Sequence, residues 1–187
     1  MSQTDPLELT AALVRCPSVT PEDGGALDVV QDVLQAAGFA CIRVDRGGVG
    51  NLFARWGDKG HARTFGFNGH TDVVPLGKRA DWTADPFGAE IRDGFLYGRG
   101  ATDMKGFVAC CLAALPAMLK ANLKTPIYFA FSYDEEIGCL GAPDLVKAIN
   151  SHYKVKPKFA IIGEPTMMRP VTGQKGICIF ETTVSGS

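Results

Sequence analysis

Apolar residues recur every three or four positions in two stretches near the start of the chain, a spacing typical of amphipathic helices. The positions are Leu9, Leu13 and Val14 in the first stretch, and Leu27, Val30, Leu34 and Ala37 in the second. Asp5-Pro6 precedes the first stretch and Thr20-Pro21-Glu22-Asp23 the second, and a capping side chain followed by proline marks a helix start. We therefore expect two helices, the second beginning near Thr20 and ending at Gly38.

A third helical stretch follows the glycine-rich segment Gly98–Gly106 in the middle of the chain. Its apolar positions are Phe107, Cys110, Cys111, Ala114, Leu115 and Met118. Asp103 lies where the turn gives way to this pattern, so we expect it to be the N-cap, with its carboxylate at the positive end of the helix dipole. Pro116 predicts a kink or an early end in a helix that would otherwise reach Lys120.

Three short apolar runs lack polar alternation, which indicates strands buried on both faces of a sheet. The runs are Thr64–Phe67, Ile127–Phe131 and Phe159–Ile162. Candidate metal ligands follow them: His70, then Asp134-Glu135-Glu136, then Glu164. Because ligands of open α/β sheets bind beyond the carboxyl ends of the strands, we expect these side chains and Asp103 to meet at one sheet edge. The expected fold class is α/β, a twisted, mostly parallel sheet with helices on both faces.

The remaining segments carry the usual signals for strands, turns and loops. We expect strands at Phe39–Val44, Asn51–Trp56 and Ile177–Val184, the last of them exposed or at a sheet edge; a hairpin of Phe87–Ile91 with Phe95–Tyr97, turning at Asp93-Gly94; a short helix at Pro143–Ile149; and a solvated basic link at Lys154–Lys158. Residues 75–88 have no clear period, and we expect an ordered loop over the site.

The chain has 187 residues, 46% hydrophobic and 21% charged, which is enough for one globular domain with a substantial core. Its net charge of -1 gives no electrostatic reason to expect nucleic-acid or membrane binding. No apolar run approaches the roughly 20 residues of a membrane span, and the N-terminus lacks the regions of a secretion signal. The six cysteines form no Cys-x-x-Cys pair, so we expect reduced, buried thiols in a cytoplasmic protein, not structural zinc ligands.

The expected ligands are carboxylates and one imidazole, a set that suits zinc, or else manganese or cobalt. A carboxylate has two oxygen atoms, so Asp103 could bridge two metal ions; paired ions in hydrolases lie about 3.5–4 Å apart and share an attacking water. One glutamate of the acidic turn could bind metal while its neighbour stays free as a general base. Asp72, two residues after His70, could hold the imidazole in the correct tautomer.

Each of these features has a more ordinary explanation when it is taken singly. His70 would be a satisfied core histidine, Asp134-Glu135-Glu136 a solvated loop, and Glu164-Pro165 a turn. Their joint occurrence at strand ends is what favours a metal site. His61 and His152 lie in polar contexts, and we expect both to be surface residues.

Four motifs, present in this order, resemble those of the M20 family of zinc-dependent amidohydrolases, and the resemblance covers essentially the whole chain. They are His70-Thr71-Asp72-Val73-Val74-Pro75, Gly98-Arg99-Gly100-Ala101-Thr102-Asp103-Met104-Lys105-Gly106, Asp134-Glu135-Glu136 and Gly163-Glu164-Pro165. The family hydrolyses N-acyl amides of amino acids or releases amino acids from small peptides.

This resemblance implies a catalytic centre with two zinc ions. It assigns His70, Asp103 and Glu164 to the first zinc. It assigns Asp103, as a bridge, and Glu136 to the second. It makes Glu135 the general base, with Asp72 orienting His70.

Within the family, the resemblance is divided between two kinds of enzyme. Residues 8–105 are similar to succinyl-diaminopimelate desuccinylases, and residues 106–187 are more similar to acetylornithine deacetylases. The longer portion favours the desuccinylase, the deacetylase is the nearest alternative, and an M20 dipeptidase is the third. The change falls inside the motif Asp103-Met104-Lys105-Gly106, which both kinds of enzyme share. A chimera joined at this motif would have such a sequence, and so would an intermediate branch of the family.

Members of the family continue into a lid or dimerisation domain, and the full-length proteins are expected to be homodimers. We therefore expect residues 1–187 to be the N-terminal part of the catalytic domain, without the lid and without the last histidine ligand of the second zinc. The expected partner is a small-molecule N-acyl amino acid, with neither nucleic acid nor membrane. An inactive metal-binding fragment is the alternative from another functional class.

Overall fold

The computed structural model describes residues 5–57, 63–153, 158–173, 175–176, 178 and 180–186. Its helices are α1 (Pro6–Val14), α2 (Ala26–Ala36), α3 (Gly106–Ala113), α4 (Leu115–Lys120) and α5 (Ala142–Tyr153), with short helical turns η1 (Arg79–Asp81), η2 (Ala101–Lys105) and η3 (Glu135–Ile137). Its strands are β1 (Ala40–Arg46), β2 (Val49–Trp56), β3 (Phe65–His70), β4 (Glu90–Arg92), β5 (Phe95–Tyr97), β6 (Ile127–Ser132) and β7 (Phe159–Ile162).

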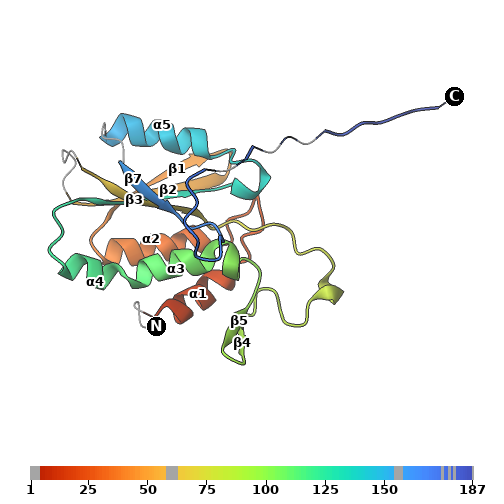
Figure 1. Cartoon of the computed structure of the whole chain (residues 1–187), viewed down its shortest axis with the longest axis horizontal. Helices are drawn as coiled ribbons and strands as arrows, with labels where there is room; N and C mark the ends of the chain where they lie inside the picture. The colour runs from red at the N-terminus through yellow and green to blue at the C-terminus, as the bar shows by residue number, and fades with distance from the viewer. Residues whose placement is uncertain are drawn as a thin grey trace.

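A five-stranded sheet lies between two layers of helices (Figure 1). Helix α5 covers one face, and α2, α3 and α4 lie on the other, with α1 packed against α3. The expected α/β class with helices on both faces is confirmed.

The strand order is β1-β2-β6-β3-β7. Strand β3 runs parallel to β6 and β7, whereas β2 is antiparallel to both of its neighbours, so the sheet is mixed where a mostly parallel one was expected. The register pairs His70 with Ser132 and Asn68 with Ile162. The carboxyl ends of these three strands therefore meet at one edge, as the sequence predicts.

Phe129, in the central strand β6, is fully buried at the middle of the core. Its ring lies 5.0 Å from that of Phe67, 5.6 Å from that of Phe39 and 5.8 Å from that of Phe131, measured between ring centroids. These contacts join β6 to the strand that carries His70. The rigid sheet can therefore hold the ends of its strands in fixed positions.

The first helix begins as predicted, and the second does not. The side chain of Asp5 accepts a hydrogen bond from the Leu7 amide at 2.8 Å and so caps α1. Helix α2 starts only at Ala26, after the N-cap Gly25, and the Asp23 carboxylate before the cap accepts a hydrogen bond from the Leu27 amide at 3.2 Å. The expected start near Thr20 is therefore wrong.

The central helix also begins later than the sequence suggests. Helix α3 starts at Gly106, and Asp103 has φ −117° and ψ 96°, which is outside the helical region. Its carboxylate points to His70 instead of capping the helix, so the N-cap prediction is wrong. The break at Ala114, two residues before Pro116, confirms the predicted early end.

The face of α3 that is buried differs from the predicted one. Its buried residues are Val108, Ala109, Cys111 and Leu112, whereas Cys110 is exposed. The sequence of α3 is apolar all round, so its periodicity could not select the face that contacts the sheet. Of the other cysteines, Cys139 and Cys178 are exposed and Cys16 and Cys41 half-buried, so the expected burial of the thiols holds only for Cys111.

The helical segment Ala101–Lys120 has 20 residues and a mean hydropathy of 1.4, which meets the length and composition of a membrane span. The expectation that no such stretch occurs is therefore too strong. In the structure this segment lies between α1 and the sheet, and it carries a fully buried Lys105. Those contacts are typical of the core helix of a globular protein.

Two predicted strands differ from the structure. Strand β7 forms, but it lies at the sheet edge with Phe159 72% exposed and Ile162 61% exposed, so the prediction that it is buried on both faces is wrong. No strand forms among residues 178 and 180–184, the described part of the predicted strand 177–184, because that part has no hydrogen-bonding neighbour. Residues 154–157 of the predicted basic link and His61 lie outside the described residues, and so does the side chain of His152.

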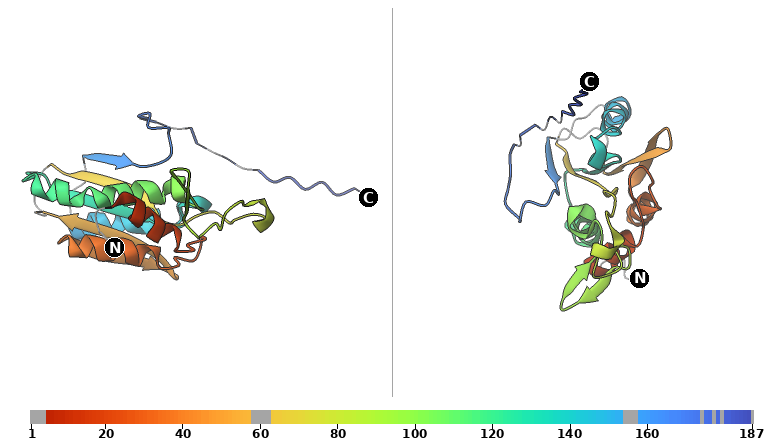
Figure 2. Two further views of the ribbon diagram at one scale, coloured as in Figure 1. Left: turned by 90° about the horizontal axis from the view of Figure 1, so that it is seen from below. Right: turned by 90° about the vertical axis from the view of Figure 1, so that its right-hand side faces the viewer.

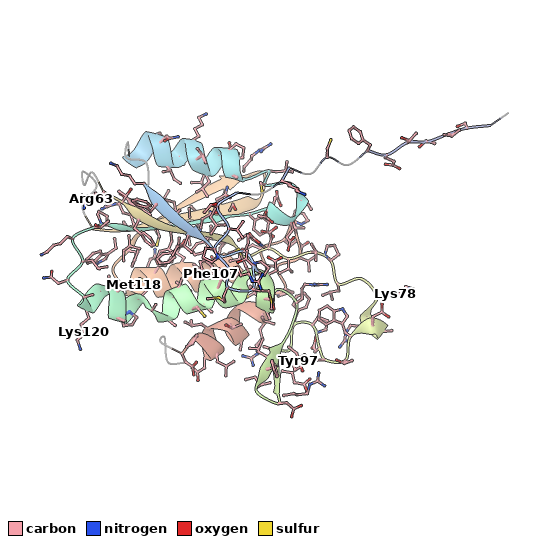
Figure 3. The ribbon with its side chains drawn as sticks, in the orientation of Figure 1. Arg63, Lys78, Tyr97, Phe107, Met118 and Lys120 are labelled. Atoms are coloured by element: carbon pink, nitrogen blue, oxygen red, sulfur yellow. The ribbon has the colours of Figure 1, made fainter. Side chains whose placement is uncertain are left out.

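The other predicted elements are present. Strands β1 and β2, the β4–β5 hairpin that turns at Asp93-Gly94, and α5 all occur, but β4 begins at Glu90 instead of Phe87, and α5 is longer than expected. Residues 75–88 project beyond the end of the sheet in two views (Figures 1 and 2). Lys78, at the start of η1, marks the outer part of this loop (Figure 3), so the loop does not close over the sheet edge.

Candidate metal centre

The candidate metal centre is built around His70, the last residue of β3, whose side chain is 1% exposed. Its Nε2 atom lies 3.2 Å from Asp103 Oδ1, 3.7 Å from Glu164 Oε1 and 3.8 Å from Glu135 Oε2. One imidazole nitrogen thus faces carboxylates from three separate segments. The parallel register of β3, β6 and β7 brings the segments of Glu135 and Glu164 to His70, whereas Asp103 comes from the turn before α3.

His70, Asp103 and Glu136 form a group in which one ligand atom from each residue lies within 4.8 Å of the others. In the described part of the chain, this is the one group of His, Cys, Asp and Glu side chains that meets such a criterion. Glu164 approaches the same imidazole nitrogen but is not a member of the group. An imidazole with carboxylates is a donor set that zinc binds, so these residues fit the expected metal.

Asp72 holds the site in a way that differs from the expected one. Its main-chain carbonyl oxygen lies 3.0 Å from His70 Nδ1, whereas its carboxylate Oδ1 is 3.6 Å from the same nitrogen. The nearer partner of the ring is therefore the carbonyl. The carboxylate Oδ2 accepts a hydrogen bond from the Glu136 amide at 3.3 Å, which joins the His70 segment to the acidic turn.

Burial raises the pKa values of three acidic groups at this site, Glu136, Glu164 and Asp72. Burial raises the pKa of Glu136, and the nearby Asp103 carboxylate raises it further. Burial also raises the pKa of Glu164 and of Asp72, although His70 opposes the effect in both. Burial by itself lowers the pKa of His70, but the surrounding carboxylates, chiefly Asp72, outweigh burial and leave it raised. A bound cation would relieve this excess of negative charge.

The turn that carries Asp103 packs tightly against the His70 segment. Gly100 has φ +78°, and a Cβ atom there would lie 2.5 Å from Val73 Cγ1. Gly69 lies against Met104, where a Cβ atom would be 2.9 Å from Met104 Cε. Glycine at these two positions therefore lets two segments distant in sequence approach closely enough for Asp103 to reach His70.

Sequence reasoning missed the segment that supports the His70 loop from behind. The hydroxyl of Ser18 donates to the Thr71 carbonyl at 2.5 Å, and the Val73 amide donates to the Ser18 carbonyl at 2.9 Å. Lys105, fully buried, donates from Nζ to the Cys16 carbonyl at 2.8 Å, and burial lowers the pKa of Lys105 to about 8. The signal available in the sequence was the position of Lys105, directly before an apolar helix, since a buried charge needs a hydrogen-bonding partner in the protein.

Phe107, labelled in Figure 3, supports the segment that carries Glu164. Its ring lies directly against Gly163, where a Cβ atom would be 2.0 Å from the ring. Any side chain at Gly163 would therefore displace Glu164 from its place near His70.

A cavity of about 420 Å³ opens beside the metal group, and Asp103, Glu136 and Arg99 are among its lining residues. This volume lies in the range of small-molecule sites. The guanidinium of Arg99 is 5.0 Å from the centre of the Trp82 ring, and its Nη2 is 3.4 Å from the Pro75 carbonyl. Arg99 is thus the one basic residue among the described residues that line the cavity, and its guanidinium is held by Trp82 and Pro75.

The sequence profile of peptidase family M20/M25/M40 matches residues 66–183. The succinyl-diaminopimelate desuccinylase of Dinoroseobacter shibae is 52% identical over 168 residues, which cover 87% of this chain and 43% of that enzyme. That of Cereibacter sphaeroides is 71% identical over 110 residues, or 59% of this chain and 29% of the enzyme. The chain thus spans less than half the length of these curated relatives.

Two crystal structures with a similar fold are those of peptidases. Human carnosine dipeptidase 1 is 28% identical, with a TM-score of 0.74 over 86% of this chain and 38% of that protein. The M20 family metallo-carboxypeptidase Sso-CP2 from Sulfolobus solfataricus is 22% identical, with a TM-score of 0.72 over 85% of this chain and 37% of that protein. The second likeness concerns the fold alone.

Proposed function

Since the chain belongs to peptidase family M20/M25/M40, we propose that the protein of which it is part hydrolyses an N-acyl amide of an amino acid with the help of bound metal. The observation that carries the proposal is the convergence of His70, Asp103 and Glu136, of which Asp103 and Glu136 line one cavity. Three potential ligands around an open space are typical of catalytic sites, which leave a position for water or substrate.

The metal is proposed to be zinc, with cobalt or manganese as alternatives, and the complete site to hold two ions. His70, Asp103 and Glu164 would hold the first ion, and Asp103 and Glu136 the second. The short distances from His70 Nε2 to Asp103 and Glu164 support the first set. Bound zinc would activate water and polarise the carbonyl group of the amide.

Glu135 is proposed as the general base. Its carboxylate would take a proton from the attacking water and deliver it to the nitrogen of the leaving amine. Its Oε2 atom lies 3.8 Å from His70 Nε2, so it is close to the proposed ligands without belonging to the metal group. Asp72 would act through His70, since its carbonyl keeps the Nδ1 side of the ring occupied and leaves Nε2 facing the carboxylates.

The proposed substrate is N-succinyl-diaminopimelate. The names of curated relatives that are 52% and 54% identical over 87% of this chain support it. N-acetylornithine is the nearest alternative, because residues 106–187 resemble deacetylases, and a dipeptide is the third, supported by the likeness to carnosine dipeptidase 1. Arg99 in the cavity wall is consistent with all three, since each carries a carboxylate.

The wider setting is proposed on the same basis. Residues 1–187 would be the N-terminal part of the catalytic domain of a cytoplasmic, homodimeric biosynthetic enzyme. An inactive metal-binding fragment or a chimeric protein is the competing proposal, and the divided resemblance at residue 105 supports it.

Steady-state assays of the complete, zinc-loaded protein test the proposal. We expect kcat/KM to be highest for N-succinyl-diaminopimelate among the three substrates, and turnover to be lost in Glu135→Gln. A higher kcat/KM for N-acetylornithine would overturn the substrate assignment. Failure to hydrolyse any of the three amides would favour the inactive alternative.

A further inference from the structure

Asn51, on β2, is a fully buried polar residue that the proposed reaction does not use. The register places Leu52 opposite Phe131, so Asn51 lies where β6 ends and the acidic turn begins. The residue begins the predicted strand Asn51–Trp56, within the portion of the chain, residues 8–105, that resembles desuccinylases. A buried amide must satisfy its hydrogen bonds within the protein.

The side chain of Asn51 binds both ends of the loop that carries Glu135 and Glu136. Its Oδ1 accepts a hydrogen bond from the Tyr133 amide at 2.9 Å. Its Nδ2 donates to the Gly141 carbonyl at 3.2 Å and to the Val44 carbonyl on β1 at 3.0 Å. Both N–H groups and the oxygen of the amide are therefore used.

Gly141 allows this close approach. A Cβ atom at Gly141 would lie 2.8 Å from Asn51 Oδ1 and 2.8 Å from the Tyr133 carbonyl oxygen. The two ends of the loop thus meet around one side chain, and the residue at the second end has to be small.

Other segments also contact the loop between these ends: the hydroxyl of Thr20 donates to Asp134 Oδ1 at 3.0 Å, Asp72 accepts from the Glu136 amide, and Arg46 donates to the Leu140 carbonyl at 3.0 Å. Its ends, Tyr133 and Gly141, are buried, whereas residues 137–140 are exposed. Asp134, Gly138 and Cys139 all have positive φ, and η3 is a single three-residue turn. Asn51 differs from these contacts because one side chain binds both ends of the loop and so fixes the distance between them.

We propose that Asn51 is a positioning residue that sets the place of Glu135 and Glu136 relative to His70 and Asp103. The inference rests on the proposed function, in which Glu135 is the base and Glu136 a metal ligand. Asn51→Asp keeps the acceptor for the Tyr133 amide but replaces the two donors with an oxygen that faces two carbonyl groups. The ends of the loop should then separate while the sheet remains formed.

Cobalt(II) titration of the metal-free 187-residue chain, followed by visible absorption, is the test. We expect Asn51→Asp to bind cobalt at least about tenfold more weakly than the wild type, with an altered visible spectrum. Leu52→Ala is the matched control: it changes the next residue on β2, which is fully buried in the core, and lowers stability without touching the loop. It should keep the wild-type affinity and spectrum.

A second variant approaches the same contact from the loop. Gly141→Ala should weaken cobalt binding by a similar factor. Gly141→Ala and Asn51→Ala disturb the same contact, so the double variant should lose less cobalt affinity than the product of the losses in the two single variants. Amide hydrogen exchange of residues 133–141 gives a readout that needs no metal, and we expect faster exchange in Asn51→Ala than in Leu52→Ala.

The two proposals fail separately. A wild-type chain that binds no cobalt would contradict the metal centre, and the exchange rates would still test Asn51. Wild-type cobalt affinity and spectrum in Asn51→Asp, or loop exchange in Asn51→Ala equal to that in Leu52→Ala, would overturn the role of Asn51.

Discussion

Replacing Gly100 by alanine should damage both the fold and the metal site. Gly100 has φ +78°, and alanine in this left-handed region costs about 1–2 kcal/mol. Its Cβ atom would also lie 2.5 Å from Cγ1 of Val73, which is fully buried and cannot move aside freely. Overpacking of this kind costs about 1–3 kcal/mol. We therefore expect Gly100→Ala to lower the free energy of unfolding by about 2–5 kcal/mol in total.

Gly94→Ala separates the two contributions. Gly94 has φ +81° in the β4–β5 turn, and no described atom lies within 4 Å of the place its Cβ would occupy. This variant should lose only the backbone contribution of about 1–2 kcal/mol. Urea unfolding of both metal-free variants measures the difference, which we assign to the contact with Val73.

Zinc affinity is the second readout of this pair. The contact between Gly100 and Val73 sets the distance between the Asp103 turn and the His70 segment, so Gly100→Ala should bind zinc at least about tenfold more weakly, and Gly94→Ala should bind it as the wild type does. Equal stability losses in the two variants, or an unchanged zinc affinity in Gly100→Ala, would refute this reasoning.

Four other outcomes follow from the structure. Zinc affinity measured by calorimetry should rise as pH increases from about 5.5 to 7.5, because His70 and Glu136 have raised pKa values and zinc must displace the protons bound to them. A zinc affinity that is flat or falls over this range would contradict this expectation. The metal-free 187-residue chain should bind one zinc clearly tighter than a second, and two equally tight sites in the same titration would contradict the ligand assignment. Phe129→Ala should lower the free energy of unfolding by about 3–5 kcal/mol, whereas the same change at Phe159, which is 72% exposed, should cost less than about 0.5 kcal/mol in urea unfolding. Glu135→Gln should lower the turnover of the complete protein by about 10²–10⁴-fold with its zinc content unchanged, and lost zinc would make Glu135 a ligand instead of a base.

The parts of the fold that depend on local pattern could be predicted from the sequence. The apolar runs before His70 and Glu136 are strands β3 and β6, and their parallel register brings the two residues to one edge. The hairpin turn at Asp93-Gly94 follows from residues that tolerate positive φ. The fold class and the meeting of the candidate ligands could therefore be derived before any coordinates were known.

The errors concern features that tertiary contacts decide. Asp103 has the residue type and position of an N-cap, but its carboxylate contacts His70 instead of the helix amides. Helix α3 begins three residues later, at Gly106. The apolar sequence of β7 indicates burial, yet the strand is at the sheet edge. The buried amide of Asn51 left no signal in the apolar pattern, because its three partners come from three different segments.

The position of bound zinc tests the central proposal most directly. Crystals of the zinc-loaded chain, measured at wavelengths on either side of the zinc absorption edge, would locate the ion by anomalous scattering. We expect a peak within bonding distance of His70 and Asp103, with Glu164 or Glu136 as a further ligand, at the edge where β3, β6 and β7 end. A strong peak at any other place, with none between His70 and Asp103, would contradict the proposed metal centre and the hydrolytic function that rests on it.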